Sequence, residues 1–140
     1  MDPSVPEPAV VLPWAGLEVT RVAFDFQTRL LFEDGAELVV EAPFTLTGPA
    51  GADTVDPEDP ATLAPALALL RRTAAGAEVA ADAALVVAFA GGPVLRVQAD
   101  PRYEAWTATG PGWNGRGPGD WMVVSSPGGG LAVWGDVPAP

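Results

Sequence analysis

The residues of this 140-residue chain that could do chemistry are almost all carboxylates and arginines. The sequence has no histidine and no cysteine, which removes the usual general base, the usual zinc ligands and any thiolate nucleophile. It has no lysine either, since all seven basic residues are arginine, so Schiff-base and P-loop lysine chemistry are excluded. The adjacent Ser125 and Ser126 therefore lack an activating base other than a carboxylate.

Paired carboxylates can hydrolyse glycosides without histidine. Asp25 and Asp82 occupy matched positions of an internal repeat, but nothing in the sequence places them about 5–10 Å apart across a cleft, as that reaction requires. Because Asp is poorly accommodated inside strands, strand ends or turns are the better interpretation of both residues. We therefore expect no catalytic residue and no enzymatic activity.

A cluster of carboxylates occupies residues 48–60, GPAGADTVDPEDP, and consists of Asp53, Asp56, Glu58 and Asp59. Such a cluster could hold Ca²⁺, but the spacing does not follow the EF-hand pattern. Its composition predicts a loop that leads into a helix, because acidic groups stabilise the positive N-terminal end of a helix. We expect no metal ion and no cofactor.

A second loop, residues 110–120, contains five glycines and two prolines in GPGWNGRGPGD. Trp and Arg are enriched at binding hot spots, and mobile loops often carry function, whereas no phosphate-binding motif is present. The sequence thus predicts a partner-binding surface consisting of Tyr103, Trp106, Trp113, Asn114, Arg116, Asp120 and Trp121. The alternatives are a disordered insertion for the loop, and core or lid packing for the pair Tyr103 and Trp106.

The charge is strongly asymmetric, with 18 acidic and seven basic residues and a net charge of −11. Such a field repels nucleic acids and steers association towards basic proteins, although it also serves solubility alone. The longest uncharged apolar stretch, residues 83–95, is too short to span a bilayer and is broken by Gly-Gly. The first 13 residues lack a basic segment and do not resemble a secretory signal, so we expect a cytoplasmic location.

The segment Arg29–Ala42 predicts a β-hairpin that turns at Asp34-Gly35. A matching pattern recurs 57 positions later in Val87–Ala99, where Gly91-Gly92 takes the place of the turn. We interpret the chain as two related β units, about residues 17–47 and 74–99. A first strand is predicted over residues 17–26, and the third could continue past Pro43 to Thr47. Whether the two units share one sheet stays open.

Between the units, Thr62–Arg72 predicts an amphipathic helix. Leu63, Leu67 and Leu70 follow helical spacing and are expected to pack on the sheet. Thr62 is the favoured N-cap because it places Pro65 in the first turn; a start at residue 59 would leave that proline in the helix interior.

The predicted fold class is therefore α+β: a mainly antiparallel, twisted sheet of about six to eight strands, built from two related hairpin units and covered by one main helix. Residues 14–134 would form a single domain, preceded by a Pro-rich arm over residues 1–13 and followed by a tail over residues 135–140. A short helical turn is expected over residues 100–106, and a last hairpin from residues 121–125 and 131–134.

Five segments of the chain resemble a known family: PFTL (Pro43–Leu46), DPEDPATL (Asp56–Leu63), DPRYEAW (Asp100–Trp106), TGPG (Thr109–Gly112) and PGGGLAVW (Pro127–Trp134). The family consists of small uncharacterised proteins common in high-GC actinobacteria, the domain of unknown function 6188. The resemblance covers about residues 14–134 and departs from the family pattern over residues 113–126, which are longer and richer in Gly and Trp. It implies a bacterial, cytoplasmic protein and supplies no catalytic residues.

The acidic charge, the missing catalytic residue types and the Trp/Arg loop together favour a non-enzymatic protein-binding module. Its sharpest form is an immunity or inhibitor-type protein that neutralises a basic partner. A small-molecule binder with Tyr103, Trp106 and Trp113 as a pocket wall is one alternative, and a structural subunit of a larger bacterial assembly is another. Neither nucleic acid nor membrane is an expected partner, and the oligomeric state stays open.

Overall fold

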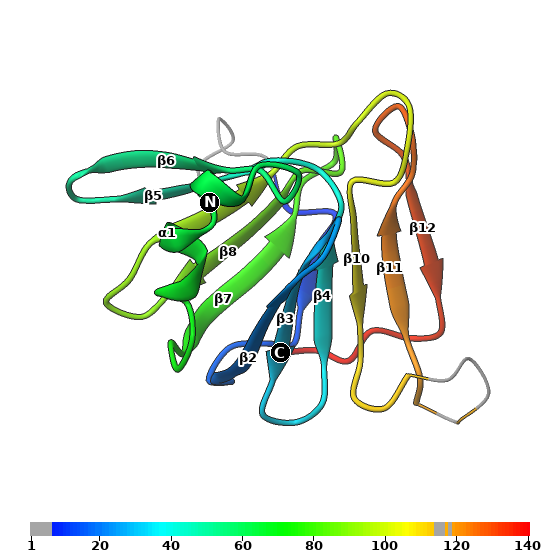
Figure 1. Cartoon of the computed structure of the whole chain (residues 1–140). Coiled ribbons are helices and arrows are strands. Elements are labelled where there is room, and N and C mark those ends of the chain that lie inside the picture. The colour runs from blue at the N-terminus through cyan, green and yellow to red at the C-terminus, as the bar shows by residue number, and fades with distance from the viewer. Residues whose placement is uncertain (1–6, 114–116, 118) are drawn as a thin grey trace.

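The fold consists of two antiparallel sheets that pack on each other, as the computed structural model of residues 7–113, 117 and 119–140 shows (Figure 1). Over these residues each sheet has six strands. The strands of the first sheet are, in spatial order, β1 (Val10–Leu12), β7 (Ala74–Val79), β8 (Leu85–Phe89), β9 (Val94–Val97), β5 (Phe44–Gly48) and β6 (Gly51–Val55). Those of the second are β12 (Leu131–Trp134), β11 (Met122–Ser125), β10 (Trp106–Thr109), β4 (Glu37–Val40), β3 (Thr28–Phe32) and β2 (Val19–Phe24).

Two hairpins of equal length occur, one in each sheet: β8–β9 at the centre of the first, and β3–β4 between β2 and β10 in the second. In β3–β4 Leu30 pairs with Leu38, and in β8–β9 Val87 pairs with Leu95. The bounds of the second hairpin lie 57 positions after those of the first. Gly35 has a φ of +92°, a backbone conformation that glycine adopts without steric cost, so the first turn can be tight.

The topology repeats in the two halves of the chain. In the first half β2, β3 and β4 lie side by side in one sheet, and the following hairpin β5–β6 crosses to the other. In the second half β7, β8 and β9 lie side by side, and the hairpin β10–β11 crosses back. Each half therefore contributes three strands to one sheet and two strands to the other. β1 extends the first sheet beside β7, and β12 extends the second sheet beside β11.

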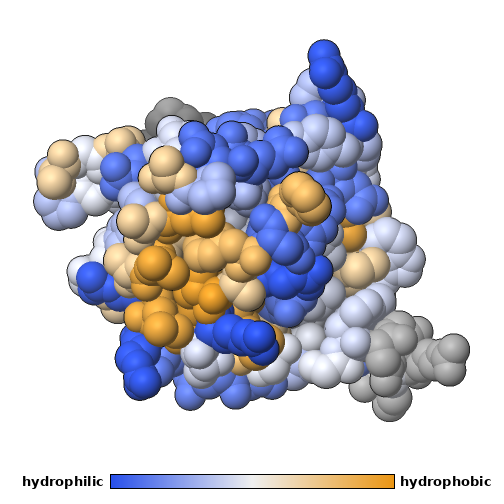
Figure 2. All heavy atoms as spheres, viewed as in Figure 1, coloured by the Kyte–Doolittle hydropathy of each residue, from blue (hydrophilic) through white to orange (hydrophobic). Residues whose placement is uncertain are grey.

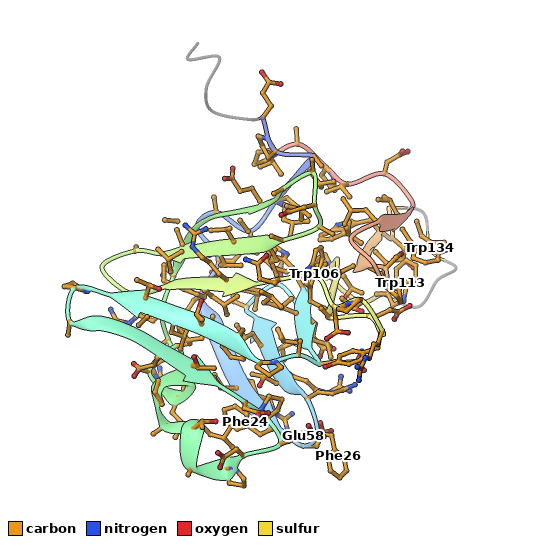
Figure 3. All side chains as sticks on the ribbon, turned by 90° about the horizontal axis from the view of Figure 1, so that it is seen from above. Phe24, Phe26, Glu58, Trp106, Trp113 and Trp134 are labelled. Carbon is orange, nitrogen blue, oxygen red and sulfur yellow. The ribbon has the colours of Figure 1, made fainter. Side chains whose placement is uncertain are left out.

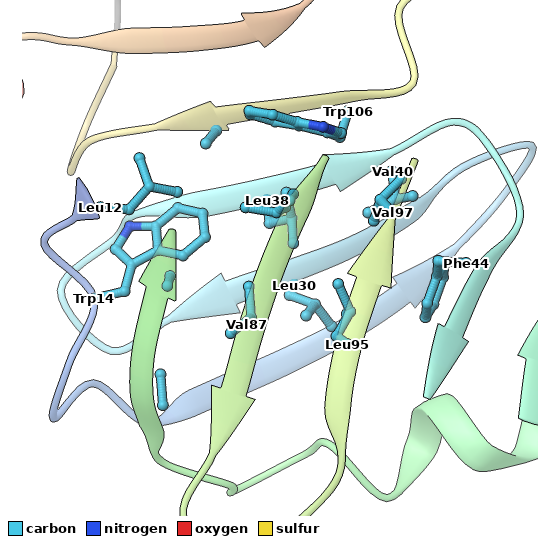
Figure 4. Close-up of a cluster of buried hydrophobic side chains, with 14 of the residues drawn as sticks. Leu12, Trp14, Leu30, Leu38, Val40, Phe44, Val87, Leu95, Val97 and Trp106 are labelled. Carbon is cyan, nitrogen blue, oxygen red and sulfur yellow. The ribbon is translucent and has the colours of Figure 1, made fainter. Parts of the chain in front are cut away.

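The core lies between the two sheets and draws side chains from both (Figure 4). Residues alternate between buried and partly exposed along β3 and β8, as expected for strands with one face on a core. Trp14 and Trp106 are fully buried, and the indole N–H of Trp106 donates to the carbonyl of Ala83 at 2.9 Å. Both sheets thus depend on one shared apolar interior.

The sheets meet at a corner between residues 16–19 and 71–74. There the N–H of Val19 donates to the carbonyl of Arg72 at 2.8 Å, and the N–H of Arg71 donates to the carbonyl of Val19 at 2.7 Å. These bonds tie the backbone of residues 71 and 72 to the start of β2. They compete with helical hydrogen bonding in the same segment.

The predicted α+β class is wrong: over the described residues the fold is nearly all β, and no main helix covers a sheet. The expected helix over residues 62–72 is replaced by a 3₁₀ turn, η1 (Pro60–Thr62), and a single α-helical turn, α1 (Ala64–Leu67). Asp59, the alternative start, caps η1, with Pro60 in its first turn. The helical turn ends early because Arg71 adopts a φ of +70° and its N–H bonds to β2.

Other boundaries also differ from those expected. β4 ends before Pro43, and β5 belongs to the opposite sheet, so the third strand does not continue through the proline. The segment expected as a loop over residues 48–60 contains β6, and the arm over residues 1–13 contains β1. Residues 100–105 form bends instead of a helical turn, because the Asp100 carboxylate accepts the N–H of Arg102 in a local turn.

Candidate functional site

The residues predicted to form one partner-binding surface do not come together. Trp106 and Trp121 are buried in the core, where Trp121 lies 6.4 Å from Trp14 between ring centroids. They therefore cannot contact a partner. The predictions for Asn114 and Arg116 fall outside the described residues.

Trp113 lies in a shallow depression on the outer face of the second sheet. Thr107, Thr109 and Met122 line this depression together with Trp113. Asp120 is engaged locally, since its carboxylate accepts the N–H of Gly117 at 3.0 Å. This face combines the hydroxyl groups of Thr107 and Thr109 with apolar side chains, among them Val39 and Met122, and Trp134 pairs with Met122 beside it.

Of the residues predicted to form the binding surface, Tyr103 lies near the carboxylates of residues 48–60, a segment that we call the carboxylate loop. Partial burial raises the pKa of its phenol above the ordinary value of 10.0, and the charge of Asp100, which also accepts a hydrogen bond from the phenol, raises it further. Glu58 and Asp56 add smaller effects of the same sign. The structure thus brings an exposed aromatic ring and part of the carboxylate loop together.

The carboxylate loop itself is organised by local hydrogen bonds. The Asp56 carboxylate accepts the N–H of Glu58 at 2.9 Å, and the Asp59 carboxylate accepts the N–H of Ala61 at 3.2 Å. Asp53 lies separately on β6, opposite Leu46 of β5. Across residues 7–113, 117 and 119–140, no three potential metal-ligating side chains are arranged to hold an ion.

The residues considered for catalysis occupy structural positions. Asp25 and Asp82 each accept a backbone N–H two residues further on, at 2.8 and 3.1 Å, in the turns after β2 and β7. Their matched places in the sequence correspond to equivalent turns of the two halves. Ser125 is fully buried, so a substrate in solution does not reach its hydroxyl.

A different surface combines the features of a binding site. Figure 2 shows apolar side chains gathered on one face over α1 and the neighbouring strands. Leu67 is 56% exposed and Leu70 is 45% exposed. Leu63 and two residues of β2, Val22 and Phe24, are partly buried and pack against the core. We call this set the α1–β2 patch; it consists of Val22, Phe24, Leu63, Leu67 and Leu70.

The patch is the place where the core reaches the surface. Val22 pairs with the buried Leu30, so it points to the inner side of the second sheet, but β2 is an edge strand and leaves it half covered. The segment over residues 60–70 covers this flank with the buried side chains of Ala66 and Leu69. Most of the leucine stripe predicted to pack on a sheet therefore faces outward instead.

Sequence reasoning missed this surface because it assumed a full helix with one buried stripe. One signal was present in the sequence: Leu69 interrupts the stripe, so the leucines of the segment cannot all lie on one face of a helix. Phe26, in the turn after β2, was assigned only to a strand, yet it is 82% exposed.

Carboxylates border the patch at the end of β2. The side-chain amide of Gln27 donates to the carboxylate of Glu41 at 2.5 Å, and the N–H of Glu41 donates to the carbonyl of Ala105 at 2.8 Å. These contacts join the turn after β2 to residues 100–105, where Tyr103 lies. We call this region the acidic end; it consists of Asp25, Glu41, Asp56, Glu58 and Asp100.

The fold and the site together define an antiparallel, two-sheet β protein with an exposed apolar patch next to a group of carboxylates. The chain belongs to a family of unknown function, DUF6188, whose model matches residues 10–135. The resemblance to this uncharacterised family is thereby confirmed, while an actinobacterial origin stays a prediction. Neither the curated proteins nor the solved structures give a match. In the described part of the chain, no helix has the length and apolar character needed to cross a membrane.

Proposed function

We propose that this protein is a non-enzymatic binding module for a basic protein partner. The observation that carries the proposal is the α1–β2 patch, an apolar surface that lies beside the acidic end. Exposed apolar side chains gathered on one face of a protein typically mark an interaction site. A patch rimmed by charge matches the usual anatomy of an interface, with an apolar centre and a polar rim.

The charge of the chain supports a basic partner. The net charge of −11 steers oppositely charged proteins towards this molecule and speeds their association. Arg72, which follows the leucines of the patch, is engaged by the carbonyls of Ala68 and Gly91. Basic groups of the partner would therefore face the acidic end, which gives the complex a defined orientation.

The sharpest form of the proposal is an immunity or inhibitor-type protein that acts in the bacterial cytoplasm. Neutralising a basic enzyme requires affinity and an acidic surface but no catalytic residue, in agreement with a sequence without histidine, cysteine or lysine. The same negative field disfavours nucleic acids as partners.

Capture from cells that encode the protein tests this function. The tagged full-length chain is compared with the double variant Leu67→Ser/Leu70→Ser and with a control, Val133→Ser/Trp134→Ser. The control residues on β12 are 49% and 47% exposed, which matches the exposure of the patch residues, but they lie on a remote strand (Figure 1). Captured proteins are identified by mass spectrometry and repurified for titration against each variant.

The expected result is one stoichiometric basic protein that binds the wild type and the control, is lost with the patch variant, and is released by raised salt. Equal binding by the patch variant and the wild type would refute the role of the patch. Recovery of several subunits of one large assembly would replace this proposal with a structural role.

A further inference from the structure

We propose that Phe26 is a preorganised anchor that inserts into an apolar pocket of the basic partner. This inference rests on the proposed binding function and names the residue at its centre. Phe26 is 82% exposed and is the most exposed large apolar side chain of the described residues. Among the described residues it belongs neither to the buried core nor to the partly buried side chains packed against that core, so the fold itself does not require a phenylalanine there.

The turn that carries Phe26 is short and closed. Phe24 pairs with Thr28, which leaves three residues in the loop between β2 and β3. Within it the N–H of Asp25 donates to the carbonyl of Gln27 at 3.0 Å, and the N–H of Gln27 donates to the Asp25 carboxylate at 2.8 Å. Reciprocal bonds of this kind fix the backbone on both sides of Phe26.

The side chain of Gln27 holds the turn against the sheet. Its amide nitrogen donates to Glu41 at 2.5 Å, and its amide oxygen accepts from the guanidinium of Arg29 at 2.8 Å. Arg29 is held in turn by an ion pair with Glu37 at 3.2 Å. A loop fixed in this way loses little conformational entropy on binding, which favours affinity. Gln27 is thus a positioning residue for Phe26.

The surroundings of Phe26 set the chemistry of the partner. Figure 3 shows Phe24, Phe26 and Glu58 at the same end of the molecule, away from Trp113 and Trp134. The flanking Asp25 is exposed, and Glu41 is bonded to the next residue of the turn. A pocket that accepts Phe26 must therefore be apolar inside and carry Lys or Arg at its rim, because an acidic rim would face these carboxylates. A second copy of this chain, with its net charge of −11, does not meet that requirement.

Site-specific photo-crosslinking in the native cells tests the anchor. In the full chain, Phe26 is replaced by p-benzoylphenylalanine, a crosslinking residue of similar shape; a matched chain carries it in place of Trp134. Irradiation should yield one discrete adduct from position 26 and none of the same mass from position 134. Mass spectrometry of that adduct should place the crosslink in an apolar pocket of a basic protein. An absent adduct, an acidic protein or a second copy of the chain would overturn the inference.

Affinity for the crosslinked protein, once purified, separates the anchor from the general binding function. Phe26→Ala should weaken binding by roughly 30-fold or more, as expected for a hot-spot aromatic residue, with an unchanged melting temperature. Gln27→Ala should weaken binding in the wild type but have no further effect in the Phe26→Ala background, because its role acts through the ring. If Phe26→Ala binds normally while Leu67→Ser/Leu70→Ser does not, the anchor is refuted and the binding module stands.

Discussion

The opposite roles of neighbouring leucines in the segment over residues 60–70 can be tested by truncating each to alanine. Leu69 is fully buried, so Leu69→Ala should lower the free energy of unfolding by about 2–5 kcal/mol through lost transfer energy and a residual cavity. Leu70 is 45% exposed and Leu67 is 56% exposed. About half of the benefit of burying a leucine is absent at these positions, so each truncation should cost only about 0.5–1 kcal/mol.

Urea unfolding followed by far-ultraviolet circular dichroism measures the three variants. All three should share the wild-type slope with denaturant, so that midpoint differences report stability alone. The reasoning would be refuted if Leu67→Ala or Leu70→Ala destabilised the fold as much as Leu69→Ala. The α1–β2 patch would then be part of the core, and its proposed role in binding would lose its basis.

Three further changes test other parts of the structure. In urea unfolding, Trp106→Phe should lower the free energy of unfolding by about 2 kcal/mol or more beyond Trp14→Phe. Only the first substitution leaves a buried carbonyl, that of Ala83, without its hydrogen bond, because the indole N–H of Trp14 has no partner among the described residues; equal costs would contradict this. Tyr103 is the single tyrosine, and phenolate absorbance should show that its pKa lies above 10.0 and that Asp100→Asn lowers that pKa. Because the pKa is raised in the folded state, the stability that the protonated phenol contributes is present below about pH 10 and is lost as the pH rises further. Arg71→Gly should raise the free energy of unfolding by about 0.5–1 kcal/mol through relieved strain, and with it the melting temperature; a lowered melting temperature would show that the positive φ costs nothing.

The sequence predicted the parts of the fold that depend on local pattern. Alternating apolar residues and a turn at Asp34-Gly35 or Gly91-Gly92 identify the hairpins β3–β4 and β8–β9, because both signals act within a few residues. The pairing of strands that lie far apart in the sequence could not be predicted. β5 leaves β4 and pairs with β9 on the opposite sheet, and no local signal encodes that crossing.

The predicted helix over residues 62–72 does not form as a whole because tertiary hydrogen bonds prevent it. Residues 62–72 have good helical propensity and one apolar stripe, yet the backbone of residues 71 and 72 pairs with Val19 instead. Tertiary hydrogen bonds of this kind override a propensity worth only a few tenths of a kcal/mol per residue. Because the predicted fold class depended on the predicted helix, this one local error gave α+β in place of all-β.

The candidate site was harder to predict than the fold because large aromatic residues serve both cores and interfaces. Trp106, Trp113 and Trp121 look alike in sequence, but two of them are buried and one is partly exposed. Among the described residues, the structure brings Tyr103 near the carboxylates of Asp56 and Glu58. Distance in sequence, from 45 to 47 positions, hides such a meeting.

The connection between the two halves of the chain carries part of the proposed site, and this placement has a physical basis. The hairpins β3–β4 and β8–β9 have equal lengths, and each is paired with strands from the other half, so the shared core constrains both alike. The connection over residues 56–73 is fixed at its end, where the backbone of Arg71 and Arg72 bonds to Val19, and before that point it covers the flank beside β2. Ala66 and Leu69 do so from within, which leaves the remaining leucines of the connection free to face a partner. Under the proposed function, these exposed leucines contact the partner while Ala66 and Leu69 keep the core covered.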